Sequence, residues 1–163
     1  MIDDDPDQTI LSRLVGCWAG TVLHRVSADQ PFAHVPGTSE NRWVLGGCFV
    51  EMTLRAGDSW SAVVYIGHER SQRRHMLVSF EPGDRRVTTR RGEWVRDRDR
   101  LLLTSDQLKA TCDVMTPGEL RLELAEQGAS GQDFVRFKAE YRPAIVAANQ
   151  AAPPRPHRRF VIA

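Results

Sequence analysis

The sequence predicts an all-β protein, a single antiparallel up-and-down β-barrel of about eight to ten strands with a short N-terminal helix. Two observations carry this prediction. From Cys17 onward, apolar residues recur with a period of two, in short segments that are separated by Gly, Asp and Pro. So many short strands in one open sheet would leave two vulnerable edges, and closure into a barrel removes them.

The N-terminal helix is predicted near residues 6–15. Four apolar residues share one helical face there: Ile10, Leu11, Leu14 and Val15. Asp5 or Asp7 can cap the helix, and Gly16 would stop it. A helix of this length can cover one open end of a barrel.

The predicted strands follow in chain order, each ended by turn residues. Their ranges are 17–26, 38–45, 48–55, 60–68, 74–81, 86–95, 101–105, 110–115, 119–125 and 133–142. The segment 27–37 contains two prolines and is predicted to be a loop. Gly46 and Gly47 are predicted to form the turn between the second and third strands.

The chain is predicted to divide into a barrel domain, residues 1–142, and a C-terminal tail, residues 143–163. The tail could begin with a short helix over 144–152 and continues through a Pro- and Arg-rich stretch. It is either a mobile terminus or a segment that docks through Phe160, Val161 and Ile162. A second copy of the chain is one partner for such docking, which would give a homodimer.

Charge and cysteine content predict a soluble cytoplasmic protein. The net charge of +1 gives no reason to expect nucleic acid or a membrane as partner. No apolar run approaches membrane-spanning length, and the acidic N-terminus does not resemble a signal peptide. Cys17, Cys48 and Cys112 are widely spaced, which predicts buried free thiols rather than disulfides or a zinc site.

Trp18 and Arg142 stand near the two ends of the strand series and are predicted to pair as structural residues. An early tryptophan can plug one end of a barrel. A late arginine can lie over the indole face and donate hydrogen bonds to nearby carbonyls. We therefore expect the Arg142 guanidinium over or beside the Trp18 ring.

Three segments resemble the calycin-like DUF1579 family. Leu14 to Gly20 is similar to its L-x-G-x-W-x-G opening, and Arg42 to Glu51 is similar to its RW-x-L-GG segment. Glu140-Tyr141-Arg142 is similar to its closing Y-x-R. Tyr65 to Glu69 departs from the family's G-Y-D. The resemblance spans most of residues 11–142. It implies a barrel like those of lipocalins and fatty-acid-binding proteins, with Trp18 pointing inward, and implies little about activity.

Two polar residues are candidates for a site inside this barrel. His24 has the same strand parity as Trp18, so its ring could meet a ligand, or it could be a satisfied or rim histidine. Glu51 shares a strand face with Phe49 and Thr53. If that face points inward, burial would raise the pKa of Glu51 and make it a proton donor or acceptor. Otherwise it could pair with Arg42 or Arg91 as a structural bridge.

Aromatic residues could line the same cavity. The ligand-binding candidates among them are Trp43, Trp60 and Tyr65, with Trp94 and Phe137 as further members. Core packing is the alternative use of each. Tyr65 lies on the opposite face of its strand from Trp60, which makes it the least certain member.

Two further clusters are interpreted as structural. His68, Glu69 and His75 could approach one another across a hairpin, but their spacing fits no metal motif and nearby arginines would repel a cation. The arginines of the hairpin over residues 85–100, Arg90 and Arg91 among them, indicate a solvated surface. No metal and no cofactor is predicted.

The favoured function is binding of a small hydrophobic or amphipathic molecule in the barrel cavity, with His24 and Glu51 setting its orientation. One alternative is a cofactor-free cyclase or isomerase in which Glu51 or His24 moves a proton. Another is haem binding, because similar barrels with a GxW-type opening can carry haem. This use needs an axial histidine, which in those relatives lies near the last strands. The chain has no histidine between His75 and His157.

Overall fold

The computed structural model describes residues 6–25, 27–58, 60–81, 86–95, 98–105, 108–115, 118–127 and 131–144. In this part of the chain there is one α-helix, α1 (Pro6–Ser12), one 3-10 helix, η1 (Leu45–Gly47), and ten strands. The first five strands are β1 (Gly16–His24), β2 (Ala33–Val44), β3 (Phe49–Ala56), β4 (Trp60–Glu69) and β5 (Arg74–Glu81). The last five are β6 (Arg86–Val95), β7 (Arg100–Thr104), β8 (Leu108–Met115), β9 (Glu119–Gln127) and β10 (Asp133–Pro143). The predicted all-β architecture is confirmed.

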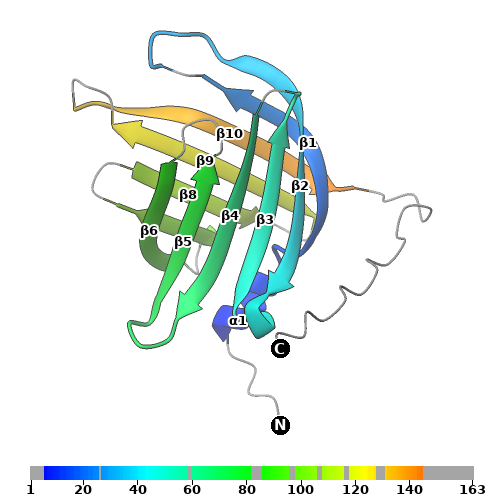
Figure 1. The fold of residues 1–163 in the computed structure, drawn as a ribbon, viewed down its shortest axis with the longest axis vertical. Helices are drawn as coiled ribbons and strands as arrows, with labels where there is room; N and C mark the ends of the chain where they lie inside the picture. Colours follow the sequence, from blue (N-terminus) through cyan, green and yellow to red (C-terminus); the bar gives the residue numbers. More distant parts are fainter. Residues whose placement is uncertain are drawn as a thin grey trace, which may run out of the picture.

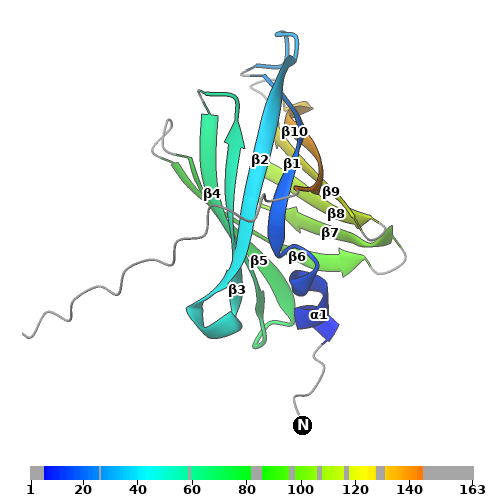
Figure 2. The same cartoon turned by 90° about the vertical axis from the view of Figure 1, so that its right-hand side faces the viewer.

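The strands form a closed barrel in which each pairs antiparallel with its neighbours in the chain, and β1 pairs with β10. α1 lies at one end of the barrel, and the strands are steeply inclined to one another across it (Figures 1 and 2). We call the end that α1 covers the closed end, and the opposite end, where β1 finishes at His24, the mouth.

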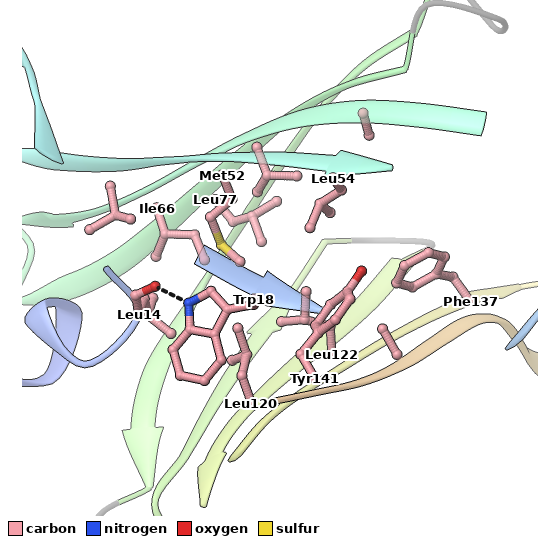
Figure 3. Packing of buried hydrophobic residues seen from close by; sticks show 14 of the residues in the cluster. Leu14, Trp18, Met52, Leu54, Ile66, Leu77, Leu120, Leu122, Phe137 and Tyr141 are labelled. Carbon is pink, nitrogen blue, oxygen red and sulfur yellow. Dashed lines mark hydrogen bonds between the residues drawn. The ribbon is translucent and has the colours of Figure 1, made fainter. Parts of the chain in front are cut away.

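Strict alternation of side chains separates the inside of the barrel from the outside. In β3, for example, Val50, Met52, Leu54 and Ala56 are buried in the core, whereas the residues between them point outward. The same alternation on the other strands fills the interior mainly with leucine, valine, isoleucine and alanine (Figure 3).

α1 ends at Ser12, earlier than predicted, and the chain continues through a tighter turn. Three consecutive backbone N–H groups bond the carbonyl three residues earlier, the last from Val15 to Ser12 at 3.2 Å. This turn leaves the Leu14 carbonyl outside the helical hydrogen-bond ladder. Leu11 and Leu14 are nevertheless fully buried, so the predicted apolar face of the helix does cover the closed end.

The Leu14 carbonyl oxygen joins three elements at the closed end. It accepts a hydrogen bond from Trp18 Nε1 at 3.0 Å and another from Asn41 Nδ2 at 2.7 Å. The Ser39 hydroxyl in turn donates to Asn41 Oδ1. Trp18, Ser39 and Asn41 are all buried, so these bonds satisfy polar groups of β1 and β2 away from water. Figure 3 shows the bond from Trp18 to the Leu14 carbonyl.

The predicted pairing of Trp18 with Arg142 is wrong. Arg142 lies opposite Ala19 in the β1–β10 ladder, so its side chain shares the outer face with Ala19 while Trp18 points inward. The Arg142 side chain is 81% exposed and approaches Glu119 at 3.6 Å. Trp18 does plug the closed end, but its polar partner is the Leu14 carbonyl.

The predicted loop over residues 27–37 is too long, because β2 already begins at Ala33 and includes Pro36. Proline is tolerated there for a local reason. β2 runs past the end of β3, whose last paired residue, Ala56, faces Gly37. On that side the Pro36 carbonyl accepts a bond from the Gly57 N–H in the next turn, at 2.9 Å, and no strand needs the missing proline N–H.

The remaining sequence predictions concern the cysteines, membrane spans and the C-terminal tail. Cys17 and Cys48 are free but exposed, so the expectation of buried thiols is wrong for both. Among the described residues, no helix has the length and apolar character needed to cross a membrane. The predicted tail, including Phe160, Val161 and Ile162, lies outside the described residues apart from Pro143 and Ala144.

Replacing Trp18 should show how much the closed end contributes to stability. We expect Trp18→Ala to lower the free energy of unfolding by about 3–5 kcal/mol, because it leaves a cavity and removes the indole donor. Trp18→Phe keeps most of the ring and should lose only about 1–2 kcal/mol. Urea titration followed by circular dichroism measures both. A loss below about 1 kcal/mol for Trp18→Ala would contradict this role.

Candidate functional site

The barrel interior contains a cavity at its centre, between the closed end and the mouth. Its volume is about 30 Å³, close to the space that one water molecule occupies in the liquid. Its walls are almost entirely apolar. The apolar lining residues are Met52, Leu54, Val64, Ile66, Leu77, Leu103, Leu122, Leu124 and Phe137.

Two polar side chains, Arg90 and Ser79, belong to the wall of this cavity. Arg90 of β6 is only 2% exposed, and Ser79 of β5 is equally buried. Arg90 Nη1 donates to Ser79 Oγ at 3.2 Å. Moving a guanidinium from water to an apolar interior is costly, so a buried arginine here is an unusual feature of the wall.

Arg90 reaches the interior because of its register in the sheet. It lies directly opposite Leu77 on β5, and residues opposite each other in an antiparallel pair share a face. Leu77 is buried in the core, so the Arg90 side chain points inward as well. The next residue, Arg91, points outward and lies 3.6 Å from Glu69.

A third polar group of the interior is the Tyr141 hydroxyl. Tyr141 is 1% exposed, and its hydroxyl oxygen has no hydrogen-bond partner among the described residues. Burial raises the pKa of this hydroxyl far above its ordinary value, so it stays protonated. Figure 3 shows the ring inside the barrel, among Leu120, Leu122 and Phe137.

At the mouth, His24 and Trp60 both lie beside Phe137. His24 faces Phe137 across the β1–β10 ladder and is half-buried on the inner side, as predicted. The Trp60 ring centroid is 4.8 Å from that of Phe137. Since Phe137 also lines the cavity, these two predicted residues lie next to a cavity residue on the mouth side.

Arg25 joins the β1–β2 connection to β10 at the mouth. Its Nε donates to the Val135 carbonyl at 2.7 Å and its Nη1 to the Ala28 carbonyl at 2.9 Å. The guanidinium also lies over the Phe32 ring, 4.5 Å from its centroid. These contacts hold the β1–β2 connection against β10, where the β9–β10 pairing has a register shift between Val135 and Phe137.

Glu51 and Tyr65 do not line the cavity, so the expectation that they do is wrong. They lie opposite each other on the outer face of β3 and β4, because the inner positions of β3 are Val50 and Met52. Glu51 Oε2 accepts a bond from the Tyr65 hydroxyl at 2.7 Å, and Glu51 Oε1 lies 2.7 Å from Arg42 Nη2. The structural bridge to Arg42 is therefore present, and the carboxylate expected in a cyclase site is absent from the interior.

The hydrogen bond from Tyr65 is the main reason that the pKa of Glu51 lies below its ordinary value, and Arg42 adds to this effect. The same bond raises the pKa of Tyr65. The lowered pKa holds Glu51 as a carboxylate at neutral pH, and the raised pKa keeps Tyr65 protonated as its donor. This is the opposite of the raised Glu51 pKa that the sequence predicted for a buried position.

Trp43 is half-buried and packs against the core, but it belongs to the closed end, where it pairs with Val50. It is therefore separated from His24 and Trp60 by the length of the barrel. His68 and His75 do pair across the β4–β5 hairpin, with ring centroids 5.0 Å apart. Among the described residues, no group of three His, Cys, Asp or Glu side chains could hold a metal ion.

Sequence reasoning missed Arg90, Ser79 and Tyr141. Arg90 was grouped with the solvated arginines of its hairpin, and that interpretation is wrong for this residue. A usable signal was present: Arg90 has the same strand parity as Trp94, a residue that packs against the core. Ser79 likewise has the parity of Leu77.

Comparison with known proteins supports the fold and nothing finer. No family model and no curated protein matches the chain. Among solved structures, the chain is similar to the crystal structure of Rv2717c from M. tuberculosis, with a TM-score of 0.63 and 17% identity. The match covers 85% of this chain and 98% of that one. At this identity the similarity shows a shared barrel fold alone.

Removing the Tyr65 hydroxyl should raise the pKa of Glu51. In Tyr65→Phe the carboxylate loses its nearest donor, so its pKa should move back toward the ordinary value. The stability that this shift contributes is present at neutral pH and is lost as the pH falls through the lowered pKa. In Tyr65→Phe this contribution should be smaller, because the folded-state pKa of Glu51 then lies closer to its unfolded-state pKa. NMR titration of the Glu51 carboxyl measures the pKa directly.

Tyr141→Phe is the matched control, because it removes a hydroxyl from the interior and leaves Glu51 untouched. An unchanged Glu51 pKa in Tyr65→Phe, or an equal change in both variants, would show that Tyr65 does not set it.

Proposed function

We propose that this protein binds a small hydrophobic or amphipathic molecule inside the barrel. The observation that carries the proposal is the central cavity, whose wall is apolar except for the buried Arg90 and Ser79. Binding sites for small molecules combine mostly apolar walls with a few polar groups that fix orientation. The outer groove beside β1, β9 and β10 differs from this cavity because charged residues, such as Glu119, Arg121 and Arg142, form half of its lining.

The present volume of about 30 Å³ is too small for such a molecule, so binding requires side chains to move apart. Two features favour this expansion. Met52 is flexible and can change rotamer at little cost. A barrel of ten strands is also wider than one of eight, whose interior is just filled by side chains. Access would be through the mouth, past His24 and Trp60.

The resemblance to the calycin-like DUF1579 family belongs to this proposal. The positions of the motif residues support this resemblance. Trp18 plugs the closed end, and Gly46 and Gly47 form the β2–β3 turn with positive φ angles. Gly20 allows β1 to approach β10, since a Cβ there would collide with the Glu140 carbonyl oxygen. We also propose a cytoplasmic location, because the exposed free thiols of Cys17 and Cys48 suit a reducing compartment.

Calorimetric titration with 1-octanol and octanoate tests binding, and a cavity-filling substitution tests its location. Val64 lines the cavity, so Val64→Phe should lower the affinity for whichever compound binds by at least about tenfold. The larger ring would occupy the ligand's space. It should also reduce stability by about 1–3 kcal/mol, so its folding is checked by circular dichroism.

Val63→Phe is the matched control. Val63 is the neighbouring residue of β4 and faces outward, so the same substitution adds a ring outside the barrel and should change affinity less than about twofold. If neither compound binds the unmodified protein, or if both variants lose affinity equally, interior binding is contradicted.

A further inference from the structure

The outer surface of β4, β5 and β6 is apolar although it is not part of the core. The side chains that form it alternate with the buried residues of the same strands, so they point away from the interior. They lie beside one another across the strand pairs, and they are Val63, Tyr65, Met76, Val78, Phe80 and Val87. We call this surface the outer apolar face. Figure 1 shows β4 and β5 side by side, next to β3, at the front of the barrel.

Phe80 and Val87 are the most exposed members of the outer apolar face. They lie opposite each other in the β5–β6 ladder, and they are 41% and 60% exposed. The Phe80 ring also packs edge-on against the Tyr65 ring, with centroids 5.9 Å apart. An aromatic cluster of this kind in water is typical of a surface that another molecule covers.

The outer positions of β9 and β10 show what a solvated face of this barrel contains. There Arg121 lies opposite Glu140, and Glu123 lies opposite Lys138, between the buried residues of the two strands. A sheet face in water is normally polar in this way. The apolar side chains of β4, β5 and β6 are therefore a local departure from the pattern of the same barrel.

We propose that a second copy of this chain covers the outer apolar face, in a homodimer with two-fold symmetry. In such a dimer the same patch of both copies comes together, so the patch must be complementary to itself. The proposal concerns the outside of the barrel and does not rest on the proposed function.

The charges at the two edges of the face are complementary in this sense. At the β3 edge Glu51 lies 2.7 Å from Arg42, and at the β6 edge Arg91 lies 3.6 Å from Glu69. If the two-fold axis runs parallel to the strands, the β3 edge of one copy meets the β6 edge of the other. Each edge then brings one cation and one anion to a partner edge with the same pair. A partner of a single charge sign would leave one charge at each edge unmatched.

The size of the face sets the strength of the dimer. Four strands spaced about 4.8 Å apart, with about seven residues each, give a surface of roughly 400–500 Å² per copy. This area is at the low end for specific interfaces, so we expect a dissociation constant on the order of 10–100 μM.

Sedimentation velocity of the full chain tests the proposal. Between about 5 and 500 μM the sedimentation coefficient should rise from the value of a monomer toward that of a dimer. In Phe80→Glu the dissociation constant should rise at least tenfold, because the interface would bury unpaired carboxylates. Val87→Glu should have the same effect, and it replaces Phe80→Glu if that variant does not fold.

Leu102→Glu is the matched control. Leu102 is 39% exposed, close to the value for Phe80, but it belongs to β7, outside the outer apolar face. The same substitution there should change the dissociation constant less than twofold. Circular dichroism checks that each variant is folded.

Exchanging charges at the edges tests the arrangement of the two copies. Arg42→Glu combined with Glu69→Arg makes the β3 edge acidic and the β6 edge basic. If these edges meet, the double variant should dimerise at least fivefold more tightly at low ionic strength. Unchanged or weaker dimerisation would contradict the proposed axis.

A chain that stays monomeric at 500 μM, or an equal loss in Phe80→Glu and Leu102→Glu, would overturn the homodimer. If the monomeric chain instead sediments with phosphatidylcholine vesicles, and Phe80→Glu abolishes this, the face binds a membrane and the second copy is wrong. None of these outcomes changes the expectation for binding inside the barrel.

Discussion

The Leu14 carbonyl is the contact on which the closed end of the barrel depends. By accepting hydrogen bonds from Trp18 and Asn41, it joins the end of the N-terminal helix turn to β1 and β2. Both bonds are buried, and an unsatisfied donor in that position would be penalised by about 1–3 kcal/mol. The same requirement explains why α1 stops at Ser12, since a longer helix would have directed the Leu14 carbonyl along its own axis.

With one end closed in this way, the alternation of the strands decides which residues can meet a ligand. A shift of one residue moves a side chain from the interior to the surface. Two neighbouring arginines therefore have different positions. Arg90 lies in the cavity wall, whereas Arg91 lies on the outer face, 3.6 Å from Glu69. Glu51 likewise serves the outer surface with Tyr65 and Arg42, while Met52 beside it lines the cavity.

The barrel, the positions of most strands and the inward direction of Trp18 could be predicted, because period-two patterns and turn residues are local signals. The site could be predicted only in part. The parity of His24 with Trp18 predicted its inward direction correctly. The direction of Glu51 depends on which face of β3 points inward, and its neighbours on that face, Phe49 and Thr53, wrongly suggested that this face is buried. The Leu14 carbonyl interaction joins residues 27 positions apart and leaves no pattern in the sequence. In the sequence, Arg90 could not be distinguished from neighbouring arginines that are exposed.

The central proposal is that the interior of the barrel binds a small hydrophobic or amphipathic molecule. A crystal structure of the protein grown with octanoate tests it most directly. We expect density for the hydrocarbon chain of octanoate among the residues that line the cavity, with Met52 and its neighbours displaced to make room for it. An unchanged interior, with octanoate bound only at the outer surface, would contradict this proposal.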